Sequence, residues 1–151
     1  MKIHIDISGQ IQQKNLDSSL GFRRSDGVTK AVFLPIRTKK ALFRKYKTQV
    51  TNLVEKIHCI MIYYCIKDSL KDVEEIHICR DGDFRAIKRL LPLLFKGHSH
   101  FHDIKITVRR KCEPASNGHW PALKAFRKRK YASSILQKDM VDKKLLGFKW
   151  E

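Results

Sequence analysis

The sequence predicts an α/β domain in which helices pack on both faces of a mixed β-sheet. Three observations support this fold class: residues 2–8 alternate between apolar and polar, residues 21–36 are typical of a hairpin, and helical and strand patterns alternate from residue 39 onward. A hairpin followed by strand–helix alternation implies a sheet with antiparallel and parallel pairs. With 151 residues the chain can build one core, so we expect a single domain over residues 1–151.

The spacing of apolar residues defines each element. Ile3, Ile5 and Ile7 share one face of the first strand. Ser25-Asp26-Gly27 provides the hairpin turn, and Pro35 ends the returning strand. The remaining pattern predicts a helix over 39–67 with Thr38 as its N-cap, a strand over 75–79, a helix over 84–95 bent or ended near Pro92, a strand over 104–110, and a last helix over 121–146.

The charge of the chain indicates a polyanionic partner. There are 32 Lys and Arg against 15 Asp and Glu, which gives a net charge of +17. Because each phosphate that a cation neutralises releases a counterion, such a surface binds nucleic acid without sequence preference. Trp120 and Tyr131 offer rings that could stack on bases, but we favour helix packing for both. The expected nucleic-acid-binding residues are Arg109, Arg110, Lys111, Lys124, Arg127, Lys128 and Lys130.

Other classes of protein and site are disfavoured. No apolar run reaches the length of about 18 residues that spans a bilayer, and the first residues alternate rather than forming a signal peptide, so we expect a cytoplasmic protein without a membrane partner. The cysteines lack zinc-site spacing and are expected to be buried, reduced thiols. Three alternating histidines form either a metal site or a polar loop: His98, His100 and His102.

Two acids follow strands in a way that indicates chemistry. Asp6 lies towards the end of the first strand, and Asp81 comes just after the strand 75–79. If these strands are parallel neighbours, both carboxylates lie at the carboxyl edge of the sheet, where ligands of open α/β sheets bind. Two carboxylates that close repel each other unless a proton or a cation lies between them, and oxygen ligands favour Mg²⁺ or Mn²⁺. Beside a phosphate backbone, such a site would support metal-assisted phosphodiester hydrolysis.

The order of elements and the position of these acids resemble the ribonuclease H-like superfamily. The stretch "IHICRDGDF" resembles the Piwi-domain strand that ends in Arg-Asp-Gly, and "HDIKITVRRK" is similar to the Piwi strand that follows. The resemblance implies a five-stranded sheet in the order 3-2-1-4-5, with Asp6 and Asp81 as catalytic metal ligands. The chain lacks PAZ and MID portions, and basic residues stand where superfamily nucleases often carry a helix glutamate: Lys39, Lys40, Arg44 and Lys45.

Several residues are candidates for the remaining carboxylate. Asp139 and Asp142 are three apart, on one helix face, and look similar to the late acids of Holliday-junction resolvases in the same superfamily; alternatively, both belong to a solvated face. Asp83 either binds metal or caps the helix that begins at Phe84. Glu55 lies away from the apolar stripe of its helix and is expected to face solvent.

The sequence therefore predicts a divalent-metal-dependent endonuclease of DNA or RNA, with Mg²⁺ or Mn²⁺ as cofactor. The alternative is a nucleic-acid-binding module of the same fold with an incomplete active site, or a subunit whose site a partner chain completes. Resolvase-like cutting of two strands would also require a homodimer. A basic surface does not distinguish RNA, DNA, hybrid and junction substrates.

Overall fold

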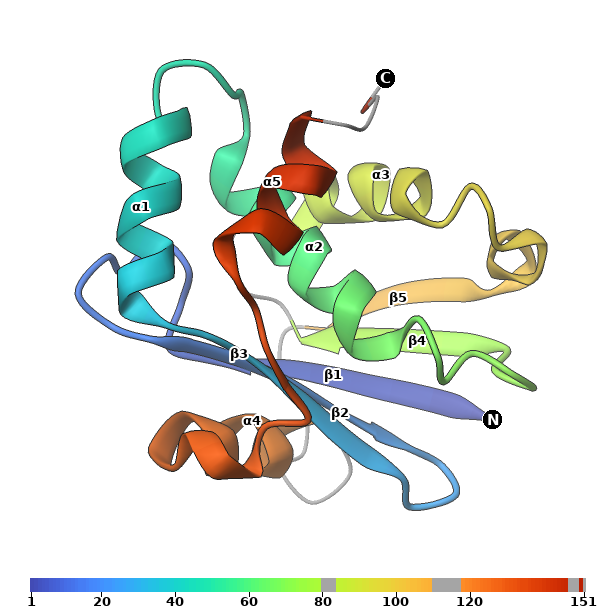
Figure 1. The fold of residues 1–151 in the computed structure, drawn as a ribbon. Helices are drawn as coiled ribbons and strands as arrows, with labels where there is room; N and C mark the ends of the chain where they lie inside the picture. The colour runs from blue at the N-terminus through green and yellow to red at the C-terminus, as the bar shows by residue number, and fades with distance from the viewer. Residues whose placement is uncertain (80–83, 110–117, 147–149, 151) are drawn as a thin grey trace.

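The fold centres on a six-stranded sheet with helices on both of its faces (Figure 1). This computed structural model describes residues 1–79, 84–109, 118–146 and 150. The strands are β1 (Lys2–Ser8), β2 (Ser18–Arg24), β3 (Thr29–Leu34), β4 (Glu75–Cys79), β5 (Lys105–Arg109) and β6 (Ser134–Ile135). The helices are α1 (Ile36–Tyr46), α2 (Leu53–Ile66), α3 (Phe84–Leu94), α4 (His119–Arg127) and α5 (Lys138–Leu146), with short 3₁₀ turns η1 (Ser99–Asp103) and η2 (Arg129–Tyr131).

The strand order is β5-β4-β1-β2-β3-β6, which confirms a mixed α/β fold. The hairpin strands β2 and β3 pair antiparallel with β1 and with each other, while β1–β4, β4–β5 and β3–β6 are parallel pairs. The order differs from the predicted five-stranded sheet because β6 extends it beyond β3. The backbone N–H groups of Ser133 and Leu136 donate to Ala31 and Phe33 of β3, at 2.7 and 2.8 Å.

Two predicted long helices are broken in the structure. The segment 39–67 forms α1 and α2, which residues 47–52 separate; Asn52, directly before α2, lies in the left-handed backbone region with φ of 53°. The predicted last helix forms α4 and α5, with η2 and β6 between them. Periodicity misled here because the connecting residues include serines and β-branched residues of low helix propensity, which take other conformations when tertiary contacts favour them. The α1 helix also begins earlier than predicted, after Pro35 rather than Thr38.

The helices are divided unequally between the two faces of the sheet. The helices α1, α2, α3 and α5 lie on one face, and α4 lies alone on the other (Figure 1). On the first face, Ile3 and Ile5 of β1 and Ile76 and Ile78 of β4 are buried against α2 and its neighbours. α2 is apolar on nearly every side because the sheet, α3 and α5 surround it.

On the opposite face, α4 approaches the sheet closely enough for backbone contact. A Cβ atom on Gly21 of β2 would lie 2.5 Å from the backbone nitrogen of Ala122. A Cβ atom on Gly118, which precedes α4, would lie 2.0 Å from the Gly21 carbonyl oxygen and 2.8 Å from the backbone nitrogen of Asp6. Only glycine allows this approach at both positions, so the start of α4 lies directly over the part of β1 that carries Asp6.

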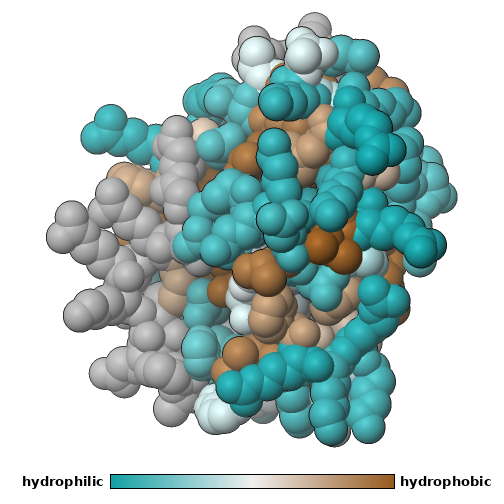
Figure 2. Space-filling model, turned by 90° about the vertical axis from the view of Figure 1, so that its left-hand side faces the viewer, coloured by the Kyte–Doolittle hydropathy of each residue, from teal (hydrophilic) through white to brown (hydrophobic). Residues whose placement is uncertain are grey.

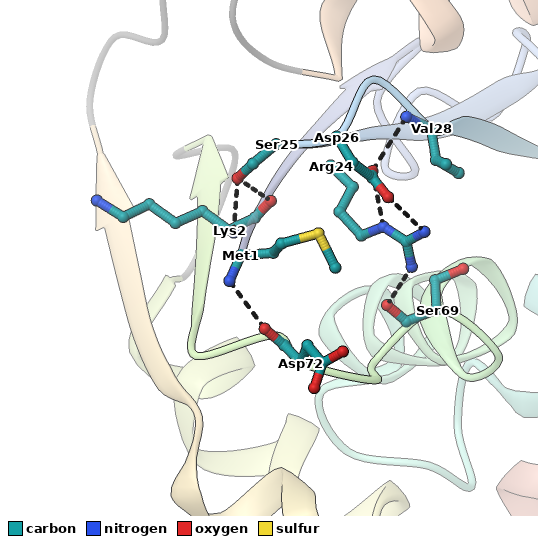
Figure 3. Close-up of polar contacts among 8 residues, drawn as sticks. All are labelled: Met1, Lys2, Arg24, Ser25, Asp26, Val28, Ser69 and Asp72. Atoms are coloured by element: carbon teal, nitrogen blue, oxygen red, sulfur yellow. Dashed lines mark hydrogen bonds and ion pairs between the residues drawn. The ribbon is translucent and has the colours of Figure 1, made fainter.

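The other end of β1 is held by a network of polar contacts (Figure 3). The Met1 amino group donates to the Asp72 carbonyl oxygen at 2.8 Å. Arg24 donates to both carboxylate oxygens of Asp26 at 2.9 Å and to the Ser69 carbonyl oxygen at 3.1 Å. Bidentate pairs of this kind are directional. The network connects the chain start, the hairpin and the α2–β4 loop, and thereby supports the register of β1.

The cysteines only partly follow the prediction of reduced thiols. Cys59 and Cys65 are buried and free, and burial raises the pKa of the Cys65 thiol to about 12. Cys79 at the end of β4 is instead disulfide-bonded, so the prediction of a reduced thiol was wrong for this residue. Cys112 lies outside the described residues. Within the described ranges, no helix has both the length and the apolar character needed to cross a bilayer.

Candidate functional site

The candidate site lies where β1 and β4 run side by side. These strands are parallel neighbours, as predicted, with Ile5 opposite Ile78. Asp6 is the next residue of β1, and it pairs with Gly21 of β2 on its other side. Beyond Cys79 the chain continues into residues 80–83, which contain Asp81 and Asp83 and lie outside the described residues. The meeting of Asp6 with Asp81 therefore stays a prediction.

Asp6 is a largely buried carboxylate whose partners offset only part of the cost of burying its charge. Its side chain is 16 % exposed, its Oδ1 accepts a hydrogen bond from the Ile7 N–H at 2.8 Å, and its Oδ2 lies 3.4 Å from Nδ1 of His119. Burial raises the pKa of Asp6 above its usual value, and the Ile7 hydrogen bond and His119 offset this only in part. The charged form is thus under-stabilised, and a bound cation would supply the missing stabilisation.

His119 is the site residue that sequence reasoning missed. It is the first residue of α4, and the backbone contact between Gly118 and Gly21 brings it to Asp6. Asp6 and His119 are far apart in the sequence, so no local pattern predicts their contact. The one nearby sign of a close backbone approach is Gly118, directly before the helix. Neutral imidazole is both a hydrogen-bond partner and a metal ligand, so His119 can either orient the carboxylate or join it at a cation.

Histidines continue along the same face of the sheet. His4 lies two residues before Asp6, and its ring stacks on that of His77 in β4, with centroids 4.8 Å apart and an interplanar angle of 13°. His77 Nε2 is 3.3 Å from Glu75, whose carboxylate also pairs with Lys2 at 3.3 Å. The Glu75 carboxylate is thus engaged at the opposite end of β4 from Asp6.

The structure does not bring the late acids to Asp6. Asp142 of α5 accepts hydrogen bonds from the Tyr46 hydroxyl and from Lys138 Nζ, the latter at 2.7 Å. Burial raises the pKa of Asp142, but these two bonds and the charges of Lys138 and Lys45 together leave the pKa below its ordinary value. Asp139 is exposed on the same helix. α5 lies on the opposite face of the sheet from α4 (Figure 1), and Asp142 belongs to the contact between α5 and α1.

No complete metal site is formed by the described residues. Within residues 1–79, 84–109, 118–146 and 150, no group of three or more His, Cys, Asp or Glu is arranged to hold a metal ion. Glu55 lies in the first turn of α2, on the other side of the sheet. Of the three alternating histidines, His98 packs against Phe95 and His100 bonds to the Val73 carbonyl oxygen at 3.0 Å, so both brace the η1 loop. A cation at Asp6 would need further ligands from outside the described residues.

Four of the seven predicted basic residues lie on α4 or directly after it. Lys124, Arg127, Lys128 and Lys130 are all exposed, whereas Ala122 and Ala125 form the buried side of the helix. Viewed from the side that carries α1, much of the surface is hydrophilic, with small apolar areas (Figure 2). Arg109 ends β5, and Arg110 and Lys111 lie outside the described residues. Trp120 and Tyr131, for which we favoured helix packing, are instead 58 % and 47 % exposed.

A buried lysine stabilises the loop that follows β1. Lys39 of α1 is fully buried, and its Nζ donates to the carbonyl oxygens of Gln10 and Gln13, each at 3.1 Å. Burial lowers the pKa of Lys39 to about 8, although Asp17 opposes this. Asp17 also accepts a hydrogen bond from the Ile36 N–H at 2.7 Å and so satisfies a donor at the start of α1. Lys39 therefore has a structural role that its place in a basic run concealed.

The depressed pKa of Lys39 predicts a specific dependence of stability on pH. Between about pH 8 and the ordinary value of 10.5 the unfolded chain holds a proton that the folded chain has lost, so stability rises with pH, by up to about 3 kcal/mol. Lys39→Met should remove this increment, while Lys40→Met at the exposed neighbouring position should keep it. Urea midpoints from pH 7 to pH 10 measure the difference. Parallel curves for wild type and Lys39→Met would contradict the assignment.

Comparison with known proteins identifies no relative: no family model, curated protein or solved structure matches the chain. The motif resemblance to ribonuclease H-like proteins is therefore untested by these comparisons. Since folds host many functions, the function has to be argued from the site.

Proposed function

We propose that this protein is a divalent-metal-dependent nuclease that hydrolyses phosphodiester bonds of nucleic acid, with Asp6 as a metal ligand. The observation that carries the proposal is the parallel register of β1 and β4, with Ile5 opposite Ile78. Asp6 follows directly and is a largely buried carboxylate with a raised pKa. Ligands of open α/β sheets collect at the carboxyl ends of such strands, where residues 80–83 continue the chain.

The strand arrangement supports a ribonuclease H-like fold for this proposal. Counted from β3, the first five strands follow the order 3-2-1-4-5, and β6 is an addition at the edge beyond β3. In this assignment Asp81 is the second metal ligand and Asp83 a further one. The positions of Asp139 and Asp142 on the opposite face give them no direct part in it.

The described residues define what the chain contributes to the reaction. The Ile7 N–H donates to Oδ1 of Asp6, so Oδ2, beside His119, is the oxygen that would bind a cation. Mg²⁺ or Mn²⁺ would activate a water molecule and neutralise the leaving oxygen. The largely buried setting strengthens the attraction between this carboxylate and a cation, because little water screens it. Exposed cations on and beyond α4 would hold the phosphate backbone.

A cleavage assay tests the proposal directly. End-labelled single-stranded RNA, single-stranded DNA, both duplexes and the hybrid are each incubated with the protein in Mg²⁺, Mn²⁺ or EDTA. We expect at least one substrate to be cut in Mg²⁺ or Mn²⁺ and none in EDTA. Cleavage that persists in EDTA, or no cleavage of any substrate with either metal, would contradict the proposal.

A non-catalytic nucleic-acid-binding module is the second candidate. It is favoured by the contact between Asp6 and His119, which already gives the carboxylate a positively polarised partner, and by the lack of a three-ligand group among the described residues. This candidate predicts equal affinity for nucleic acid in Mg²⁺ and in EDTA, with no cleavage. A partner chain that supplies the missing carboxylate would instead restore cleavage when it is added.

A further inference from the structure

We infer that the outer face of α4 and the η2 turn form a stacking platform for single-stranded nucleic acid. We call it the aromatic–basic face; its members are Trp120, Lys124, Arg127, Lys128, Arg129, Lys130 and Tyr131. The inference names a substrate class for the proposed nuclease. Binding of the strand does not depend on that proposal, but its delivery to Asp6 for cleavage does. His119, at the start of the same helix, lies 3.4 Å from the Asp6 carboxylate.

Trp120 and Tyr131 are exposed, although α4 also has a side that packs against the sheet and is buried. Trp120 is 58 % and Tyr131 47 % exposed, whereas Ala122 and Ala125 are at most 1 % exposed. Among the described residues only two other large hydrophobic side chains are exposed, and both are aliphatic: Leu16 and Leu146. Aromatic side chains at a surface are typical of recognition sites, because their rings offer a large rigid contact area.

Cations lie beside the ring of Tyr131, and the segment that carries both rings is free of acids. Residues 118–138 contain no Asp or Glu, which a merely solvated charged face would usually include. The Nζ atoms of Lys124 and Lys130 lie over the Tyr131 ring, 4.8 and 5.3 Å from its centroid, so a stacking base has to displace at least one of these flexible side chains toward the phosphates. A base stacked on Tyr131 would therefore have cations beside it to neutralise the adjoining phosphates.

The positive surface continues from η2 to the start of α1. A cavity of about 490 Å³ there is lined by Arg37 and Arg129, together with polar Thr38 and Gln137. The guanidinium of Arg129 lies 4.8 Å above the ring of Phe33, which supports it from the sheet. The cavity can hold a sugar–phosphate unit next to the aromatic–basic face, so the cationic track is longer than α4 itself.

Exposed rings discriminate between single strands and duplexes. In a duplex the bases already stack on one another, so Trp120 and Tyr131 would gain no partner and only phosphate contacts would remain. In a single strand each base has a free face, and stacking on an aromatic side chain contributes irrespective of sequence. The combination of rings and cations thus points to single-stranded RNA or DNA, two ligands that share this chemistry.

Tryptophan fluorescence provides the first test. Trp120 is exposed while Trp150 is 8 % exposed, so a base stacking on the face should quench the emission of Trp120 selectively. Titration with oligo(dT) and oligo(U) in EDTA, without metal, should quench wild-type emission, and Trp120→Phe should lose this quenching while it keeps most of the affinity. Comparing the two oligomers separates DNA from RNA. Binding of both without any quenching would overturn the inference.

Affinity measurements provide the second test. Trp120→Ala and Tyr131→Ala should each weaken single-strand binding about tenfold or more and leave duplex binding nearly unchanged. Leu146→Ala, at a 62 % exposed aliphatic residue on α5, is the matched control and should change neither. Circular dichroism checks that the variants fold. Unchanged single-strand affinity, or equal losses for single strands and duplexes, would refute the platform.

The two proposals can fail separately. Quenching and aromatic-dependent binding without any metal-dependent cleavage would support the platform and refute the nuclease. Cleavage that Trp120→Ala and Tyr131→Ala leave unaffected, with single-strand affinity also unaffected, would support the nuclease and refute the platform.

Discussion

Asp6→Asn is expected to reduce metal-dependent cleavage at least about 100-fold, because a neutral amide cannot supply the charge that holds a cation against the phosphate. The amide oxygen can still accept the Ile7 hydrogen bond, so the local backbone should be preserved. Burial disfavours the carboxylate at this position, and its removal should leave the melting temperature equal to or above that of wild type. Cleavage rates in Mg²⁺ and Mn²⁺, with melting temperatures alongside, measure both effects.

Asp139→Asn is the matched control, because Asp139 is an exposed acid of the same type on α5. It should retain wild-type cleavage, and both variants should bind nucleic acid as wild type does in EDTA. Full activity in Asp6→Asn would remove Asp6 from the reaction. An equal loss in Asp139→Asn would show that the late acids matter despite their place on the other face of the sheet.

Gly21→Ala is expected to destabilise the fold by at least about 2 kcal/mol through overpacking. The new Cβ would lie 2.5 Å from the Ala122 nitrogen and 3.0 Å from the Pro121 carbonyl carbon. These are backbone atoms of α4, so relief requires the whole helix to move away from the sheet. Such a shift would also carry His119 away from Asp6 and lower nuclease activity.

Thermal and urea denaturation measure the loss in Gly21→Ala. Gly97→Ala is the matched control, since a Cβ atom there would meet nothing within 4 Å, and its stability should stay close to wild type. If both variants melt at the same temperature, the close approach of α4 to β2 is not as tight as the structure indicates.

Prediction from sequence succeeded where local pattern decided the structure. The alternation of Ile3, Ile5 and Ile7 identified β1, and the parallel neighbours β1 and β4 were predicted correctly. Prediction failed where long-range contacts outweighed helical periodicity, as at β6, whose pairing with β3 interrupts the predicted last helix. It also failed for side-chain environment: Lys39 was assigned to a basic run but is buried, and Trp120 was assigned to packing but is exposed.

Local sequence pattern was enough to predict the positive charge, the position of most strands and helices, and the placement of Asp6 on a central strand. Strands and helices can be predicted in this way because side chains repeat every two residues along a strand and about every 3.6 residues along a helix, so the pattern is visible over a few positions. Three features followed from packing between distant parts of the chain. Asp6 contacts His119, Asp142 of α5 accepts a hydrogen bond from Tyr46 of α1, and Trp120 on α4 is exposed to solvent. The reason is physical: each outcome depends on which distant surfaces pack together, and close approaches such as that of Gly118 to Gly21 are set by the whole chain.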